Sequence, residues 1–200
     1  MVIYPIIDSV DGGDDQWINW VAELRQSTMG MNDWNKGGKL EDFFYAYKDW
    51  HFDWLDVAQL IIDAEQILEY PMVDRDPVDR WSFGRVTLLG DAAHPMYPRG
   101  ANGGAQAVID ARTLAELLAE IDDPVEALGA YENARLATTG RIVRTNREHP
   151  PDYINIRVDE LTGGMPFKNI DDVISQDELK RISENYARIA GFSHDAMRRS

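Results

Sequence analysis

Cysteine is absent from the 200 residues, which excludes disulfides, thiolate nucleophiles and cysteine-ligated metals. Basic residues are scarce, because 20 Lys and Arg stand against 35 Asp and Glu and give a formal net charge of −15. A field of that sign repels nucleic acid and anionic membrane surfaces. No apolar stretch approaches the ~20 residues that a membrane span needs, and no basic segment precedes the short apolar run at the amino terminus. The sequence therefore predicts a soluble, cytoplasmic protein without nucleic-acid or membrane partners.

Ligand and nucleophile patterns are sparse as well. The histidines show no close metal-ligand spacing, so no metal site is predicted: His51, His94, His149 and His194. No serine lies in a nucleophile elbow, which leaves a hydrolase triad without support. The sequence also lacks a Gly-x-Gly-x-x-Gly turn, the element that holds the pyrophosphate of a dinucleotide in Rossmann-type domains.

What is present includes a hydrophobic content of 44%, enough to bury a real core. A hairpin-like pair of strands is predicted over 2–7 and 17–24, helices around 40–49 and 53–64, and a further strand over 66–77. Aromatic residues gather in this part of the chain, where each either lines an aromatic pocket or belongs to the core. They are Trp17, Trp20, Trp34, Phe43, Phe44, Tyr45 and Trp50.

The stretch GRVTLLGDAAHPMYPRGANGGAQAVIDA, residues 84–111, joins a predicted strand to a predicted helix. The apolar run Val86 to Leu89 lies between two glycines, which predicts a short strand buried on both faces, with Asp91 at its carboxyl end. Asn102 is a suitable N-cap for a helix ending near residue 121. The residues spaced for one apolar face of that helix are Ala105, Val108, Leu114, Leu117, Leu118 and Ile121.

Two more helices follow. Asp123 is expected to cap a long helix that starts at Pro124 and ends before Pro150. The remainder is expected to be loop with one helix near 176–190, whose charge-rich sequence is typical of a solvated amphipathic helix.

The connection at 84–111 makes a specific chemical environment. Strand ends in α/β sheets open into ligand crevices, and glycines let the backbone approach a flat or phosphorylated ligand closely. The N–H groups and dipole of a helix start favour an electron-rich group, and Asp91 is an acceptor suited to a sugar-type hydroxyl. The alternative is that Asp91 only caps a turn and that the glycines serve tight packing.

The same run resembles the second flavin-binding fingerprint of the single-component FAD-dependent aromatic monooxygenases, the group of p-hydroxybenzoate, salicylate and phenazine hydroxylases. That fingerprint is Gly-Asp followed by Pro-x-Gly-x-Asn and Asp-Ala. The flanking segments DRDPVDRW and LAELLAEIDDPVEALGAYENAR resemble the same group. The resemblance implies an α/β fold, with a mixed-sheet remnant of the substrate domain in residues 1–75. The carboxyl-terminal part of an FAD-binding domain, with two long helices, would occupy 76–200.

The resemblance also implies cofactor-binding roles, but no catalytic residue. Asp91, after Gly90, would accept hydrogen bonds from the ribityl chain of FAD, and Pro98 would lie beside the isoalloxazine. His94 is expected to be a structural hydrogen-bonding residue. The backbone that would face the pyrimidine edge of the flavin belongs to Gly100, Ala101, Asn102 and Gly103.

The implied activity is hydroxylation of a small aromatic substrate through a flavin C4a-hydroperoxide, with NADPH or NADH as reductant. Because the Gly-x-Gly-x-x-Gly half is absent, the chain is expected to be the carboxyl-terminal half of such an enzyme. A complementary chain would then carry the N-terminal dinucleotide-binding half. The alternative is a non-catalytic flavin-binding fragment or subunit that associates with another chain.

Overall fold

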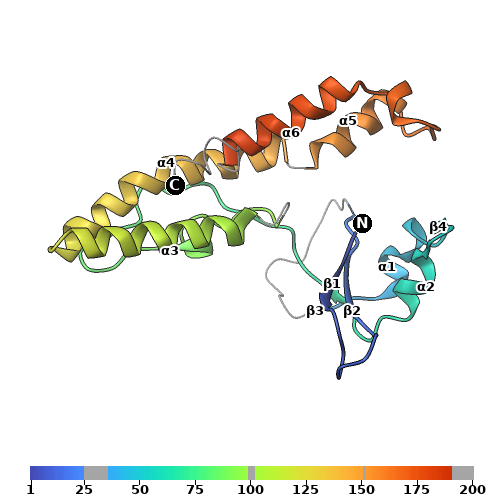
Figure 1. Cartoon of the computed structure of the whole chain (residues 1–200), viewed down its shortest axis with the longest axis horizontal. Coiled ribbons are helices and arrows are strands. Elements are labelled where there is room, and N and C mark those ends of the chain that lie inside the picture. The colour runs from blue at the N-terminus through green and yellow to red at the C-terminus, as the bar shows by residue number, and fades with distance from the viewer. Residues whose placement is uncertain (25–35, 99–101, 151, 191–200) are drawn as a thin grey trace. The chain divides into compact units, whose positions relative to one another are not determined.

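The structure is a computed structural model that describes residues 1–24, 36–98, 102–150 and 152–190 (Figure 1). The chain divides into two compact units, Met1–Pro71 and Met72–Ser200. Helices and strands are both present, in keeping with the predicted α/β class. The assignment of residues 1–75 to a substrate domain and 76–200 to an FAD-binding part stays a prediction.

The first unit is built from short antiparallel strand pairs and two small helices. β1 (Val2–Ile7) pairs with β2 (Trp17–Val21), as the alternating pattern predicted. The other pairs are β3 (Lys36–Gly37) with β6 (Leu68–Glu69), and β4 (His51–Phe52) with β5 (Leu55–Asp56). The helices are α1 (Leu40–Phe43), continued by the 3₁₀ turn η1 (Phe44–Ala46), and α2 (Val57–Ile62).

These elements differ from the prediction in length and pairing. The strand expected over 66–77 is reduced to the two residues of β6, and the helix expected from residue 53 begins only after β5. The Asp56 side chain sets that start, because it accepts a hydrogen bond of 2.9 Å from the Gln59 amide. All the strand pairs in the described residues are antiparallel, so the expected mixed sheet is not found among them.

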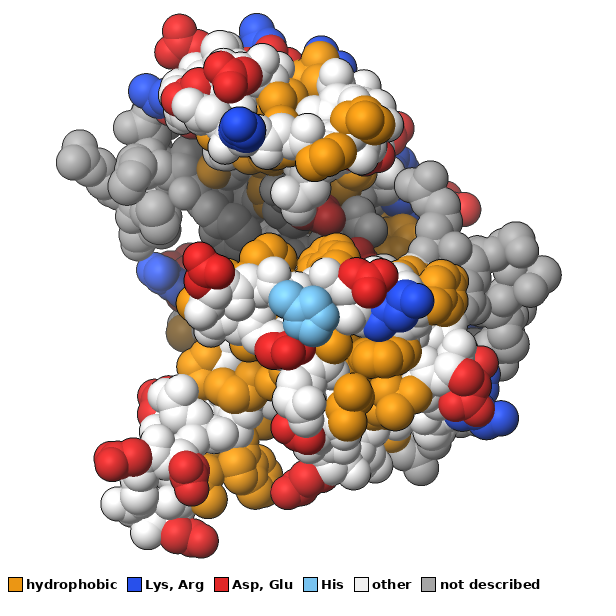
Figure 2. Space-filling view, turned by 90° about the vertical axis from the view of Figure 1, so that its right-hand side faces the viewer, with side chains coloured by type: hydrophobic (Ala, Val, Ile, Leu, Met, Phe, Trp, Pro, Cys, Tyr) orange, Lys and Arg blue, Asp and Glu red, His pale blue; other side chains and the backbone are white. Residues whose placement is uncertain are grey.

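The aromatic residues of the first unit divide between core and surface. Tyr47, Val57 and Ile61 form the buried cluster, and Trp20 and Phe43 pack against it. Three of the aromatics proposed for a pocket are instead exposed: Trp17, Tyr45 and Trp50. Trp34 lies outside the described residues. The face in Figure 2 shows such exposed hydrophobic side chains lying among acidic ones.

The second unit is helical. α3 (Asn102–Glu120) and α4 (Pro124–Glu148) are the two long helices predicted there, and they lie side by side after a three-residue connection (Figure 1). Asp123 caps α4 by accepting a hydrogen bond of 2.9 Å from the Val125 amide. α5 (Tyr153–Thr162), which the sequence pattern did not reveal, packs against α6 (Gln176–Ala190). The 3₁₀ turns are η2 (Gly90–Ala92) and η3 (Ile170–Asp172).

The strand predicted over Val86 to Leu89 is not formed. Val86 makes only an isolated bridge with Phe83 around a tight turn, in which Gly84 has a φ of +64°. The Val86 side chain is 64% exposed. A buried strand needs neighbouring strands for its backbone hydrogen bonds, and no strand among the described residues pairs with residues 86–89.

No helix in the described part of the chain is long and apolar enough to cross a membrane.

Candidate functional site

The site predicted from the sequence centres on the η2 turn. Gly90 has a φ of +59°, a conformation that glycine adopts without the strain of a side chain. A Cβ atom at this position would also lie 3.2 Å from the Cβ of Ala107, on α3. The Gly90 carbonyl accepts hydrogen bonds of 2.9 Å from the amides of Ala93 and His94. Gly90 thus lets the chain turn tightly against α3 and leaves Asp91 at the surface.

The Asp91 carboxylate lies beside the first turn of α3. A Cβ atom built on Gly103 would be 3.6 Å from Asp91 Oδ1 and 3.6 Å from Met96 Cγ. The structure therefore brings three of the predicted residues together at the start of this helix: Gly90, Asp91 and Gly103. Pro98 is exposed at the end of the preceding segment. Gly100 and Ala101 lie outside the described residues.

A buried charge cluster lies directly behind this surface. Asp110, on α3, has no exposed surface and accepts hydrogen bonds from His94 Nε2 at 2.5 Å and Arg135 Nε at 2.6 Å. Its Oδ2 also accepts the Gly90 amide at 3.2 Å. His94 is therefore confirmed as a structural hydrogen-bonding residue. Through these contacts Asp110 joins the η2 turn to α3 and α4.

The cluster continues along α3 as a chain of buried amides. Arg135 Nη2 donates to Gln106 Oε1 at 2.7 Å, and Gln106 Nε2 donates to Asn102 Oδ1 at 3.2 Å. Asn102 Nδ2 then donates to the hydroxyl of Tyr186, on α6, at 2.8 Å. The Asn102 side chain is fully buried, so it points into the protein rather than toward a ligand. At this position only the backbone is left for the predicted flavin contact.

The polar stripe on α3 replaces part of the apolar face expected there. The buried residues of the helix are Asn102, Gln106 and Asp110, spaced four apart, whereas Val108 is 70% exposed. Leu114 and Leu117 continue the inward face and pack against Trp81 and Tyr131. Sequence reasoning missed the stripe because polar residues are usually exposed on helices. Their spacing of four was the available signal.

Asp110 is held in its charged form. Burial alone would raise the pKa of this carboxyl, but hydrogen bonds from His94 and Arg135 and the charges of both outweigh that effect, so the pKa lies below its usual value of 3.8. A carboxyl whose pKa is lower in the folded state stabilises the fold fully above its unfolded pKa. That stabilisation is lost as the pH falls through the folded pKa.

We expect the free energy of unfolding of the wild type to fall more steeply than that of Asp110→Asn as the pH falls below about 5. The asparagine variant, already less stable at neutral pH, has no such carboxyl to protonate. Urea unfolding across this pH range measures both curves. Parallel curves would show that the charge of Asp110 is not coupled to folding.

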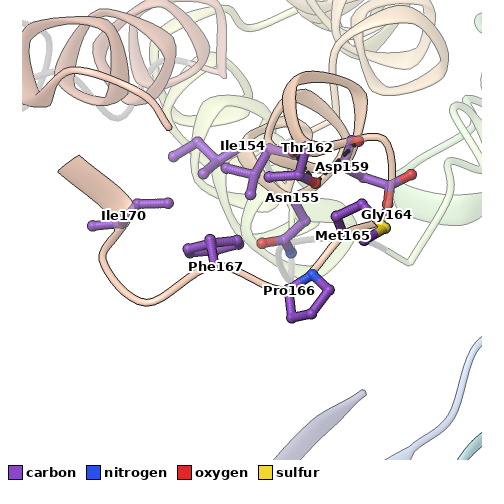
Figure 3. Close-up of a pocket in the computed structure, with 10 residues that line it drawn as sticks. Ile154, Asn155, Asp159, Thr162, Gly164, Met165, Pro166, Phe167 and Ile170 are labelled. Atoms are coloured by element: carbon purple, nitrogen blue, oxygen red, sulfur yellow. Dashed lines mark hydrogen bonds between the residues drawn. The ribbon is translucent and has the colours of Figure 1, made fainter. Parts of the chain in front are cut away.

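A hollow of about 470 Å³ lies between α5 and residues 163–170. Figure 3 shows side chains of α5 facing the segment that carries Met165, Pro166 and Phe167. Its lining is mostly apolar, with the single carboxylate of Asp159, and includes none of the predicted flavin-binding residues. A group of three or more potential metal ligands is absent from the described residues.

Comparison with known proteins found one matching family and several similar proteins. The family described as FAD binding domain matches residues 58–146, which include η2, α3 and most of α4. The chain is 50% identical over 132 residues to a phenazine 1,6-dicarboxylic acid hydroxylase of Lysobacter antibioticus, covering 66% of this chain and 32% of that protein. It is 42% identical over 121 residues to a 3-amino-4-hydroxybenzoate 2-monooxygenase of Streptomyces platensis, covering 60% and 30%.

A third relative is a 3-hydroxybenzoate 6-hydroxylase of Aquipseudomonas alcaligenes, 46% identical over 115 residues, with 54% of this chain and 29% of that protein covered. The chain thus spans about a third of the length of the curated relatives it matches. The family match at residues 58–146 includes the buried cluster and the exposed Asp91 carboxylate beside α3. The chain is therefore similar to hydroxylases and monooxygenases of aromatic acids, and residues 58–146 match the FAD-binding family that its Gly-Asp and Pro-x-Gly-x-Asn motifs predicted.

Proposed function

We propose that the start of α3 and the η2 turn form the ring side of an FAD site in an enzyme that hydroxylates small aromatic acids. The observation that carries this proposal is the exposed Asp91 carboxylate beside the first turn of a 19-residue helix, inside the segment that matches the FAD-binding family. When bound, FAD reduced by NADH or NADPH supplies the oxygen chemistry. The intermediate expected from the sequence belongs to this proposal.

The residues present suit two parts of FAD, the hydroxyl groups of its ribityl chain and the electron-rich edge of its ring system. A carboxylate is an acceptor at neutral pH, so Asp91 binds and orients hydroxyl groups such as those of the ribityl chain. The first N–H groups of α3 have no partners within the helix and point toward its amino end. With the helix dipole they stabilise negative charge on a ligand placed there. A Cβ atom at Gly103 would lie 3.6 Å from Asp91 Oδ1, so Asp91 lies beside this turn.

The substrate class rests on the names of the relatives. Each of those reported above acts on an aromatic ring that carries a carboxylate: a phenazine dicarboxylic acid, an aminohydroxybenzoate and a hydroxybenzoate. We extend the same class to this protein. The role of this chain in the reaction is to bind and orient the flavin, since none of its described residues is assigned a proton-transfer step.

A complementary polypeptide belongs to the same proposal. The 200 residues contain no Gly-x-Gly-x-x-Gly turn, so the pyrophosphate of FAD would be held by residues outside this sequence. The second candidate function is a flavin-binding subunit without catalysis of its own. Addition of NADH or NADPH and 3-hydroxybenzoate to the FAD-loaded protein separates the two, because only the enzyme consumes the reductant in step with substrate.

The proposal predicts a specific loss of FAD affinity in Asp91→Ala. A hydrogen bond to a charged group contributes about 1.5–3 kcal/mol, so the dissociation constant should rise at least about tenfold. Titration of the full chain with FAD, followed by flavin fluorescence, measures the constant. The melting temperature should stay near that of the wild type, because Asp91 is exposed.

Asp122→Ala is the matched control. This residue is an exposed acid between α3 and α4, so its removal changes the net charge equally and touches no predicted site residue. We expect its FAD affinity to equal that of the wild type. Equal weakening in both variants would attribute the effect to overall charge, and tight binding by Asp91→Ala would reject the proposed site.

A further inference from the structure

Tyr186 lies outside the segment that matches the FAD-binding family, yet its hydroxyl contacts the start of α3. The hydroxyl accepts a hydrogen bond from Asn102 Nδ2 at 2.8 Å and donates one to Asn146 Oδ1 at 2.8 Å. Asn102 and Asn146 are both buried. Burial raises the pKa of Tyr186, so the hydroxyl keeps the proton that it donates. A single hydroxyl therefore joins α3, α4 and α6.

This contact determines how the first residue of α3 is held. The Asn102 amide has two ends: Oδ1 accepts from Gln106 within the same helix, and Nδ2 donates to Tyr186. With both ends engaged, the side chain cannot turn back to compete for the N–H groups of the first turn. Asn is a residue that otherwise caps such N–H groups readily. The backbone of this turn stays available to a ligand.

We infer that Tyr186 is a positioning residue, which acts through Asn102 to hold the first turn of α3 in its ligand-binding conformation. The identity of the ligand in this inference rests on the proposed FAD site. It assigns a part of that site to Tyr186 on α6, about 40 residues beyond the end of the family match. The competing explanation is that the hydroxyl only fastens α6 to the helix pair, in which case its loss lowers stability without changing the start of α3.

Tyr186→Phe removes the hydroxyl and little else. We expect the FAD dissociation constant to rise roughly three- to tenfold, since an ordinary hydrogen bond contributes a factor of this size. The fluorescence of bound flavin should change as well, because the first turn of α3 no longer has one conformation. Tyr47→Phe is the matched control, since the Tyr47 hydroxyl donates an equally short bond, 2.8 Å, to the Glu23 carbonyl in the first unit. It should leave FAD affinity unchanged.

Hydrogen exchange of the free protein tests the positioning role without the cofactor. In Tyr186→Phe, the amides of residues 106–109, which bond back to the carbonyls of the first turn of α3, should exchange faster, while those of residues 111–120 keep the wild-type rate. If the wild type binds no FAD but this local change is seen, the positioning role stands and the proposed function fails. Unchanged exchange at the start of α3 would overturn the inference, as would faster exchange spread evenly over α3, α4 and α6.

A double-mutant cycle identifies the route of the effect. If Tyr186 acts through Asn102, the Tyr186→Phe substitution should not weaken FAD binding further once Asn102→Ala is present. Additive losses of affinity in the double variant would contradict an action through Asn102.

Discussion

Replacing Arg135 with alanine should lower the free energy of unfolding by about 3 kcal/mol or more. The guanidinium is the cation of a buried ion pair, with Nε 2.6 Å from Asp110 Oδ1, and it also donates to Gln106 Oε1. Its removal leaves the buried Asp110 carboxylate without its guanidinium partner. Leaving a buried charge without its partner costs more free energy than the ion pair contributed, because the desolvation penalty of the remaining charge persists. Urea unfolding followed by circular dichroism measures the loss.

Arg112→Ala is the control for the general effect of losing an ion pair. Arg112 Nε lies 2.8 Å from Glu116 Oε1, a comparable distance, but both side chains are more than half exposed. Exposed pairs of this spacing contribute about 0.3–0.5 kcal/mol, so this variant should be nearly as stable as the wild type. Similar losses in both variants would mean that burial of the Asp110 pair has no energetic consequence.

Trp81→Ala should cost about 3–5 kcal/mol of unfolding free energy, the usual range for a large buried aromatic residue. Trp81 is 2% exposed and lies between two rings, with centroid distances of 5.7 Å to Tyr131 and 5.6 Å to His94. Alanine leaves a cavity beside His94, which helps to hold the η2 turn through Asp110. We therefore expect FAD affinity to fall together with stability, measured by urea unfolding and flavin titration of the same preparation.

Trp54→Ala provides the comparison, because that side chain is 80% exposed and belongs to the first unit. Its stability should lie within about 0.5 kcal/mol of the wild type. An equally small effect at Trp81 would show that the core around Tyr131 is not packed as described.

The two helices of the second unit were predictable because local signals agree along them. Asp123 and Pro124 marked the start of α4 correctly. α3 begins at Asn102 itself, whose side chain bonds Gln106 and Tyr186 from the first helical position, so the expectation that Asn102 is the N-cap was wrong. Capping depends on side chains within a few residues, so the sequence carries it directly. The glycine of the Gly-Asp motif is also explained locally, since a φ of +59° at Gly90 favours a residue without a side chain.

The buried cluster was not predictable in the same way. Asp110 and Arg135 lie 25 positions apart, and each taken alone is a residue that usually faces solvent. Only the packing of α3 against α4 removes both from water and makes each necessary to the other. The strand expected over Val86 to Leu89 is not formed, which also depends on distant residues. An apolar run becomes a strand only when neighbouring strands accept its hydrogen bonds.

The sequence by itself determined the extent of α3 and α4, the flavin fingerprint and the family to which it points, because each depends on residues close together in the chain. Only the tertiary structure decided which of those residues are available to a ligand. It turned the Asn102 side chain inward to Tyr186, 84 positions away, and left the Asp91 carboxylate at the surface. Hydrogen bonds between distant residues form when helices pack, and no local pattern of residue types specifies which helices meet.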